Sequence, residues 1–338
     1  MSDAQPKVPS SGSTERKVLL GVVVGALVYA GIVLYADMDA LGGALEGYRW
    51  WTFGAALGLV SVGYGLRWAK WEIYLRLLGI RLPLGRSVLA FLAGFVMTVT
   101  PGKVGEVVKS VLLRQSDGVA VARTAPVVLA ERLTDLIALI ILAAMGIGTY
   151  QYGATALLAV SALVLAGVVL LSWDRGVRAG LAMVARVPMG RRLEPKLREA
   201  YDSTRVLLKP RPLLVTTVVS VLAWGLEAVA FVLIVRGFSN VDPALSADFG
   251  AGGFVYAMTT IIGAVSFLPG GLGVTEAGMI SALQVLEIVS MPAVASAASI
   301  LARLATLWWA VVVGVFAFAA FQRLYIKGRT PAPDAEGP

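Results

Sequence analysis

The chain has 338 residues, of which 58% are hydrophobic and 15% charged, with a mean hydropathy of +0.80 and a net charge of +8. Soluble domains average about 45–50% apolar and about 25% charged residues, so this composition excludes an ordinary soluble protein. Cysteine and histidine are both missing from the sequence, which excludes disulfides, thiolate nucleophiles, imidazole acid–base catalysis and the usual transition-metal sites. We therefore expect an integral membrane protein with several spans, without enzymatic activity and without a cofactor.

The predicted elements follow apolar runs of about 20 residues, the length that a membrane-spanning helix needs. A polar segment, residues 1–17, is expected to be a disordered cytoplasmic N-terminus, and residues 326–338 a cytoplasmic tail. The transmembrane domain expected between them, residues 18–325, has predicted spans at 18–36, 50–69, 124–149, 153–172, 213–235 and 293–321. Two further apolar stretches, 87–114 and 249–286, are each interrupted at a Pro-Gly pair. The predicted fold class is all-α integral membrane, with about six transmembrane helices and two re-entrant helical hairpins.

The orientation follows from lysine and arginine, which collect in cytoplasmic loops. Basic residues are concentrated in the segment 173–212 and at and beyond the end of the second predicted span, from Arg67 and Lys70 to Arg86. Both segments lie on one side of the membrane if 87–114 enters and returns, which also places Lys109 in the cytoplasm. An eight- or ten-span version, in which the interrupted stretches cross fully as pairs of helices, preserves this orientation, but arms of this length are too short to span comfortably. We therefore predict re-entrant hairpins, with both termini on the cytoplasmic side of the inner membrane.

The two interrupted stretches share a motif. VTPGKVGE (99–106) and FLPGGLGVTEAG (267–278) both contain Pro-Gly-x-x-Gly followed by glutamate. The matched residues are Pro101, Gly102, Gly105 and Glu106 in the first stretch and Pro269, Gly270, Gly273 and Glu276 in the second. Because the two hairpins open from opposite faces, the halves 18–150 and 153–325 are predicted to form an inverted repeat. In transporters with this architecture, the substrate site lies near the bilayer midplane between the repeats.

The hairpin tips are candidate anion sites. Irregular backbone at membrane depth is tolerated only when it is buried in protein or lines a wet cavity, and a helix that restarts there directs unpaired N–H groups and a positive dipole end into the membrane. Lys103, which faces Gly271 in the alignment of the two motifs, is expected either to meet a phosphate or to extend toward the cytoplasm. The two glutamates have two compatible interpretations: each satisfies its own helix N-terminus, or each acts as a gate or counter-ion.

One arginine lies inside an apolar span of each half, in LAERLTDL (129–136) and ILARLATL (300–307). Arg132 has Glu131 beside it and Asp135 at i+3 on the same helix face. Such a charge is costly in the bilayer and normally faces a partner or a cavity. A structural ion pair and a headgroup contact are both open for Arg132. For Arg303, the candidate partners are Glu276, Glu227 and an anionic ligand.

Glu227 stands alone in the predicted span 213–235. A role as partner of Arg303 from a neighbouring helix is the plainer interpretation, with proton coupling as the alternative. The candidate headgroup-binding set therefore comprises the two hairpin tips, the Glu131–Arg132–Asp135 group, Glu227 and Arg303.

At these residues the sequence resembles the lysylphosphatidylglycerol synthase transmembrane-region family. The segments that carry the resemblance are YGLRWAKW (64–71), TPGKVGEVVKSVLL (100–113), VVLAERLTDL (127–136) and LPGGLGVTEAG (268–278). The family includes the flippase half of the bacterial multiple peptide resistance factor and stand-alone flippase-like proteins. The resemblance, which covers about residues 18 to 325, implies a single domain that translocates a lipid. Because the aminoacyl-transferase domain of the full-length factor has no counterpart here, lysyl-lipid synthesis is not expected.

The function predicted is that of a lipid flippase that moves a polar, phosphate-bearing lipid between the bilayer leaflets. Its expected partners are lipids with anionic or zwitterionic headgroups, and a homo-oligomer or a lipid-synthesising enzyme is left open as a protein partner. Nucleic-acid binding is not expected. One alternative is a secondary transporter of a small ion or solute on the same inverted scaffold. Another is a non-catalytic membrane partner of a lipid-modifying enzyme. An ATP-driven pump is disfavoured because no G-x-x-x-x-G-K-[ST] motif occurs.

Overall fold

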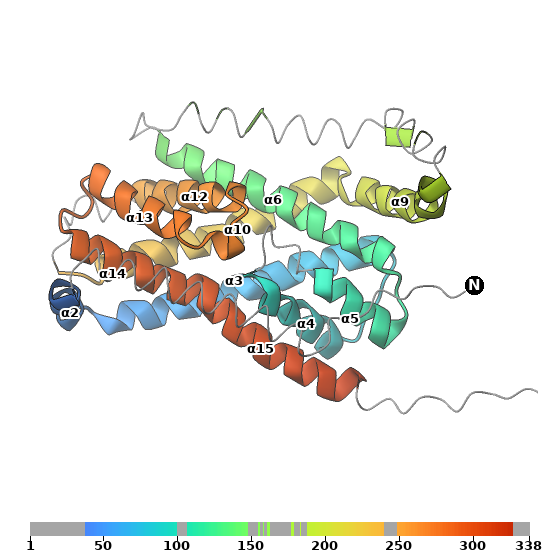
Figure 1. Ribbon diagram of the computed structural model, residues 1–338, viewed down its shortest axis with the longest axis horizontal. Helices are drawn as coiled ribbons and strands as arrows, with labels where there is room; N and C mark the ends of the chain where they lie inside the picture. Colours follow the sequence, from blue (N-terminus) through green and yellow to red (C-terminus); the bar gives the residue numbers. More distant parts are fainter. Residues whose placement is uncertain are drawn as a thin grey trace, which may run out of the picture.

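The computed structural model describes residues 38–99, 107–147, 188–239 and 249–326, together with isolated positions at 155, 158, 161–162, 177–178 and 183. This part of the chain is all-helical (Figure 1). Its helices are α2 (Met38–Glu46), α3 (Trp50–Leu77), α4 (Leu84–Ala93), α5 (Val108–Asp117), α6 (Val121–Ile147), α9 (Pro188–Leu207), α10 (Pro210–Arg236), α12 (Phe249–Val265), α13 (Val274–Val285), α14 (Pro292–Arg303) and α15 (Trp309–Phe321). Short 3-10 turns, η1 (Gly94–Met97) and η3 (Pro269–Gly271), follow α4 and α12, and π-helical segments, η4 (Leu304–Trp308) and η5 (Gln322–Ile326), follow α14 and α15.

The long helices coincide with four of the predicted spans. Among the described residues, two stretches are long and apolar enough to cross a membrane, Pro210–Arg236 and Pro292–Ile326. Helices α3 and α6 have 28 and 27 residues, which gives each a length of about 40 Å, but both carry charged side chains inside the bundle. The predicted spans 18–36 and 153–172 lie outside the described residues, apart from isolated positions in the second.

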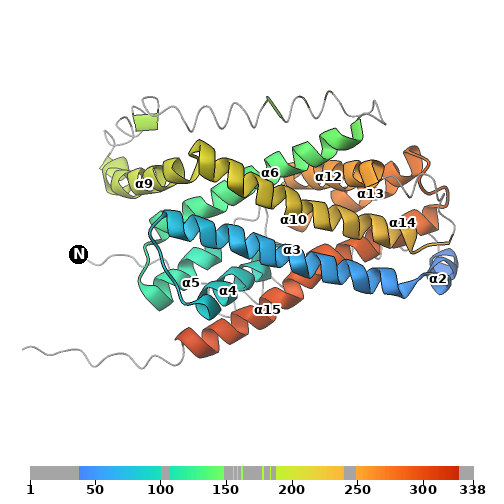
Figure 2. The same cartoon turned by 180° about the vertical axis from the view of Figure 1, so that it is seen from behind.

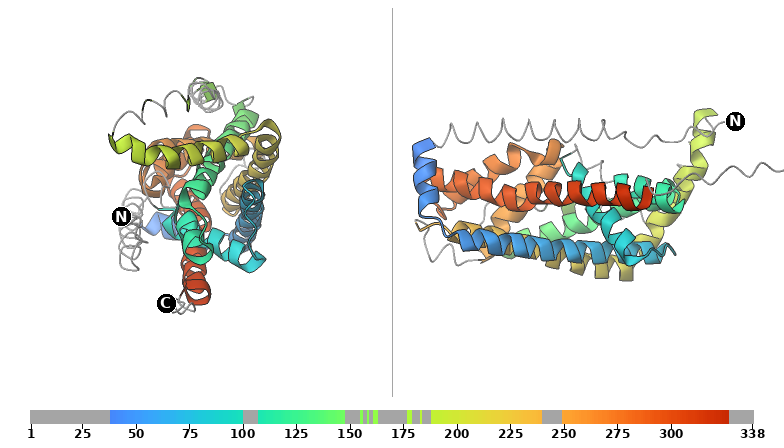
Figure 3. Two further views of the ribbon diagram at one scale, coloured as in Figure 1. Left: turned by 90° about the vertical axis from the view of Figure 1, so that its right-hand side faces the viewer. Right: turned by 90° about the horizontal axis from the view of Figure 1, so that it is seen from below.

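Two pairs of shorter helices fill opposite ends of the molecule. In Figures 1 and 2, α4 and α5 lie in the half that contains α9, and α12 and α13 lie in the half that contains α2. The apolar helices Leu84–Met97 and Phe249–Val265 are about 21 and 26 Å long, less than the roughly 30 Å of a bilayer core. Helix α9 lies across the end of the bundle in both views of Figure 3.

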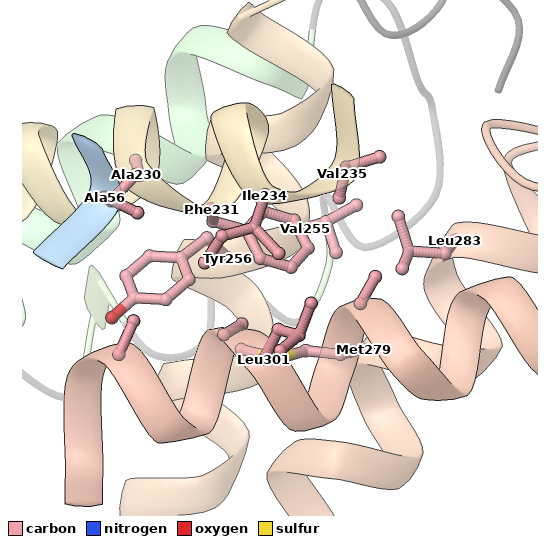
Figure 4. Close-up of a cluster of buried hydrophobic side chains, with 14 of the residues drawn as sticks. Ala56, Ala230, Phe231, Ile234, Val235, Val255, Tyr256, Met279, Leu283 and Leu301 are labelled. Carbon is pink, nitrogen blue, oxygen red and sulfur yellow. The ribbon is translucent and has the colours of Figure 1, made fainter. Parts of the chain in front are cut away.

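Buried apolar side chains hold these elements together. The larger cluster joins α3, α6, α10, α12, α13 and α14, and includes Phe231, Val255, Tyr256, Met279 and Leu301 (Figure 4). A second cluster joins α3, α4, α5 and α15 around Trp71, Tyr74 and Phe91. The polar site described below lies among these clusters.

A small third cluster brings the two interrupted stretches together. It consists of Val99, which follows η1, Leu272, which follows η3, and Leu307 and Val311 from the η4–α15 segment. Residues that are far apart in the sequence therefore meet next to both turns.

Candidate functional site

A buried lysine and glutamate join α5 to α6. Lys109 Nζ lies 2.5 Å from Glu131 Oε2, and both side chains are almost completely buried. The ammonium group also lies 4.7 Å from the ring centroid of Trp71 and 5.2 Å from that of Phe91. Its stem crosses Gly94, where an added Cβ would lie only 2.6 Å from Lys109 Cγ. The lysine that was expected in a cytoplasmic loop is therefore fixed inside the bundle by charge, aromatic faces and a glycine.

The next group of polar side chains joins α3, α6 and α10. Lys70 Nζ lies 2.5 Å from Asp135 Oδ1 and donates to Ser220 Oγ at 2.7 Å. The Ser220 hydroxyl in turn donates to Asp135 Oδ1 at 3.0 Å, and Thr134 accepts from Lys70 at 3.3 Å. Arg132 Nη2 lies 3.4 Å from Asp135 Oδ2, which confirms that the two share a helix face. The negative charge of Asp135 is thus compensated by cations from two helices, Lys70 on α3 and Arg132 on α6.

A third group surrounds Glu227 on α10. Arg67 Nη2 lies 2.6 Å from Glu227 Oε1, and the Tyr256 hydroxyl donates to Glu227 Oε2 at 2.5 Å. The guanidinium carbon of Arg67 lies 4.3 Å from the ring centroid of Trp224, one turn before Glu227. The expectation that Glu227 pairs with Arg303 is therefore wrong, because α3 supplies a nearer cation.

The fourth group fastens the second hairpin turn to α14. Arg303 Nε lies 2.7 Å from Glu276 Oε1, and an Nη2 hydrogen bond reaches the carbonyl oxygen of Gly270. Glu276 Oε2 accepts the backbone N–H of Gly273 at 2.8 Å. Glu276 therefore caps its own helix and serves as the counter-ion of Arg303, so that both interpretations of this residue hold together.

The backbone of the turn requires its glycines. Gly270, Gly271 and Gly273 have φ angles of 62°, 68° and 86°, a region that other residues avoid. At Gly271, an added Cβ would also lie 2.6 Å from Thr275 Oγ1. This positive-φ turn places the Gly270 carbonyl against Arg303.

A π-helical segment follows Arg303 directly. Such segments are frequent at functional sites because they displace backbone groups from the regular ladder. Here the carbonyl oxygen of Thr306 accepts a hydrogen bond from the Tyr64 hydroxyl at 3.3 Å. Tyr64 lies one turn before Arg67 on α3, so the π segment is bound to the helix that carries the third group.

These four groups form one continuous file of charges, which we name the ion-pair file. Glu131 and Asp135 lie one turn apart on α6, and Lys70 and Arg67 lie one turn apart on α3. Tyr64, one turn before Arg67, donates to the carbonyl oxygen of Thr306, three residues after Arg303. The file therefore runs from the α4–α5 half of the molecule to the turn between α12 and α13. Because an isolated charge at membrane depth is costly, alternation of cations and carboxylates is what permits so many charges inside an apolar bundle.

Within the predicted site, the structure joins Arg132 to Asp135 and joins Arg303 to Glu276 and the Gly270 carbonyl, with Gly273 donating to Glu276. Glu131 and Glu227 instead pair with Lys109 and Arg67, which lie outside the predicted set. Pro269 and Gly271 lie in the same turn. Pro101, Gly102, Lys103, Gly105 and Glu106 lie outside the described residues. Among the residues that are described, no cluster of three carboxylates suited to a metal ion is found.

Sequence reasoning missed Arg67, Lys70 and Lys109. All three were assigned to cytoplasmic loops, whereas Arg67 and Lys70 lie within α3, which continues to Leu77. The signal was present in YGLRWAKWEIYL (64–75), where aromatic and aliphatic residues continue past both cations. Basic residues near the end of a span satisfy the positive-inside rule whether they face water or a buried carboxylate.

Comparison with known proteins gives two findings. A family model described as lysylphosphatidylglycerol synthase TM region matches residues 18–314, which include all four groups of the ion-pair file. A UPF0104 membrane protein of Methanothermobacter thermautotrophicus is 31% identical over 133 residues, covering 39% of this chain and 37% of that protein. The aligned part is thus little more than a third of the relative's length. The family match confirms the resemblance seen in the motifs.

Proposed function

The chain belongs to the lysylphosphatidylglycerol synthase TM region family, and we propose that it moves a polar, phosphate-bearing lipid between the two leaflets of the membrane. It is a membrane protein, and the family is named for a membrane region associated with lipid synthesis. The proposal assigns transport to this chain and no catalytic step. It extends to localisation in the inner membrane, with both termini in the cytoplasm.

The observation that carries the proposal is the ion-pair file. A lipid headgroup that changes leaflet must pass through about 30 Å of hydrocarbon, and it needs polar partners along that path. Pairs such as Lys70–Asp135 and Arg67–Glu227 provide partners on several helices, so that a headgroup can replace one member of a pair without leaving the other in a purely apolar environment.

We also propose that the α4–α5 and α12–α13 pairs are re-entrant hairpins of an inverted repeat. Three features support this interpretation: the repeated Pro-Gly-x-x-Gly motif, the short arms and the cluster in which Val99 meets Leu272. In such transporters, discontinuous helices place the substrate site at the interface of the repeats. The ion-pair file lies at that interface in the proposed arrangement.

Labelling of single introduced cysteines tests the hairpins, and no native thiol competes for the reagent because the chain contains no cysteine. Gln115→Cys, at the end of α5, and Ser290→Cys, between α13 and α14, both introduce thiols at exposed positions. We expect an impermeant maleimide to label position 115 only from the cytoplasm and position 290 only from outside. Labelling of both positions from the same side contradicts the opposed hairpins.

A vesicle assay tests the transport itself. Purified protein is reconstituted at matched protein-to-lipid ratios with a phosphatidylglycerol analogue that carries a fluorophore on one acyl chain, and an impermeant reductant reports its appearance in the outer leaflet. We expect wild type to accelerate exchange and Arg132→Ala to slow it strongly. The matched control is Arg76→Gln, which changes a 72%-exposed side chain at the end of α3. Equal rates for wild type and empty vesicles contradict the proposal and favour transport of a small ion or solute.

A further inference from the structure

We propose that Arg67 and Arg132 form an anion site that binds the phosphate group of the transported lipid, with Arg67 as the residue missing from the sequence-based set. This inference rests on the proposed function and names the chemistry by which the headgroup is recognised. Three features support it: an unpaired donor on Arg67, the position of both arginines next to the Lys70–Asp135 pair, and the greater exposure of the cations relative to the carboxylates.

Arg67 holds a donor without an acceptor. Among the described residues, its buried Nε has no hydrogen-bond partner, although Nη2 lies 2.6 Å from Glu227 Oε1. A buried donor that is left unpaired costs free energy comparable to a lost hydrogen bond. The stack on Trp224 keeps the guanidinium plane in place. Arg67 is therefore preorganised for a further acceptor that the described protein groups do not supply.

Arg132 lies in the same neighbourhood. Arg132 contacts Asp135 on α6, and Asp135 pairs with Lys70, which lies one turn after Arg67 on α3. Both arginines therefore lie next to the Lys70–Asp135 pair, Arg67 as the neighbour of Lys70 on its helix and Arg132 through its own contact with Asp135. An anion beside that pair would be attracted by both guanidinium groups.

The exposure of the side chains indicates the charge of the ligand. Arg132 and Arg67 are 33% and 17% exposed, whereas the carboxylates of Asp135 and Glu227 are 6% and 5% exposed. The side chains of the two cations are therefore less completely covered than those of the two carboxylates, which favours an anionic ligand over a cationic one. The planar guanidinium group matches the oxygens of a phosphate with parallel hydrogen bonds. The charge of a phosphate therefore matches this site, and that of a purely cationic headgroup does not.

The experiment is a binding competition read by native mass spectrometry of the full chain in detergent. The probes are phosphatidylglycerol and a glucosyl diacylglycerol with the same acyl chains, which carries no phosphate. We expect wild type to prefer phosphatidylglycerol and Arg67→Gln to lower this preference about tenfold, the value of one charge-assisted hydrogen bond. Arg76→Gln, on the same helix but at its exposed end, is the matched control and should bind like wild type.

Two further variants separate phosphate binding from simple charge balance. Arg67→Lys keeps a cation near Glu227 but loses Nε and the planar fork, so we expect it to remain defective. In Arg67→Gln/Glu227→Gln the uncompensated carboxylate is gone, so folding should recover, as measured by the melting temperature, while the preference for phosphatidylglycerol stays low. Wild-type preference in either variant overturns the proposed site and shows that Arg67 only neutralises Glu227.

Inorganic phosphate separates a lipid ligand from a free anion. If millimolar inorganic phosphate displaces phosphatidylglycerol from wild type and raises its melting temperature, the site binds a soluble anion and the lipid assignment is overturned. If Arg67 variants lose phosphatidylglycerol binding while wild type moves no lipid in vesicles, the anion site stands and the proposed transport fails. If wild type moves lipid and the variants bind it normally, the transport stands and the anion site fails.

Discussion

Arg132 and Arg303 occupy matching positions in the two halves of the sequence, yet their surroundings differ. Arg303 holds Glu276 at 2.7 Å and the Gly270 carbonyl, and its side chain is 11% exposed. Arg132 lies 3.4 Å from Asp135 and is 33% exposed. The same residue type therefore fastens a turn in one half and presents a cation in the other.

The difference teaches that a repeated motif need not carry a repeated role. Asp135 has its equivalent in Thr306 when the two segments are aligned, so the second half lacks the carboxylate that draws Lys70 and Arg132 together. In its place, a π-helical segment begins after Arg303 and its Thr306 carbonyl bonds Tyr64. Substitutions that break these contacts one at a time separate a structural role from exposure of a cation to a ligand. We expect the largest loss of stability where a buried contact is broken and the smallest at Arg132.

The largest loss of stability is expected for Arg303→Ala. The substitution leaves Glu276 as a completely buried carboxylate without its cation and removes the hydrogen bond to Gly270, for an expected cost of about 3–5 kcal/mol. The melting temperature in detergent measures the effect. Adding Glu276→Gln should recover much of the loss, whereas adding Glu227→Gln should not, because Glu227 pairs with Arg67. Recovery with Glu227→Gln alone would contradict the pairing.

A somewhat smaller loss is expected for Lys109→Gln. Glu131 then loses its ammonium partner, but the glutamine amide can still donate to it, so the cost should lie near the lower end of the range for buried pairs, about 3 kcal/mol. Lys109→Met together with Glu131→Leu should recover stability, since apolar side chains of similar size replace a buried pair at little cost. A melting temperature for Lys109→Gln equal to that of wild type would show that Lys109 faces water.

The sequence predicted much of this comparison but not its decisive contacts. Apolar length located α3, α6, α10 and the Pro292–Ile326 stretch, and helix spacing placed Asp135 on the face of Arg132. Glu276 was among the partners considered for Arg303, because an unpaired arginine at membrane depth needs a carboxylate or a ligand.

The remaining contacts depend on how helices rotate and cross, which one sequence does not contain. Glu227 pairs with Arg67 because α3 and α10 lie side by side over much of their length. Lys109 is buried because Gly94 leaves room for its stem between Trp71 and Phe91. Counting the charges between two spans predicts the side of the membrane, but it predicts neither the rotation of α10 nor the depth of α5.

A moderate effect is expected at the turn that Arg303 fastens. Gly270 has φ of 62°, where an alanine costs about 1–2 kcal/mol, and its Cβ would lie 3.2 Å from Leu307 Cδ2. Gly270→Ala should lower the melting temperature and slow lipid exchange. The control is Gly253→Ala within α12, where no atom lies within 4 Å of the added Cβ and alanine favours the helix. Equal stability of the two variants would contradict the described turn.

The smallest effect on stability is expected for Arg132→Gln. Its pair with Asp135 is long and partly exposed, and Asp135 keeps Lys70 at 2.5 Å, so no buried carboxylate is left without a cation. The expected cost is less than about 1 kcal/mol, because partly exposed ion pairs contribute little. Lipid exchange in vesicles should nevertheless fall strongly, since the more exposed cation of the file is lost.

Arg132→Gln is thus expected to change lipid exchange and not stability. For Arg303→Ala the melting temperature is the measure that reports the contact, because Glu276→Gln should restore much of it. Arg132→Gln that melts like wild type and also exchanges lipid like wild type would leave the first arginine with neither role. A melting temperature lowered as far as in Arg303→Ala would instead show that both arginines fasten the structure, and the difference between the two halves would disappear.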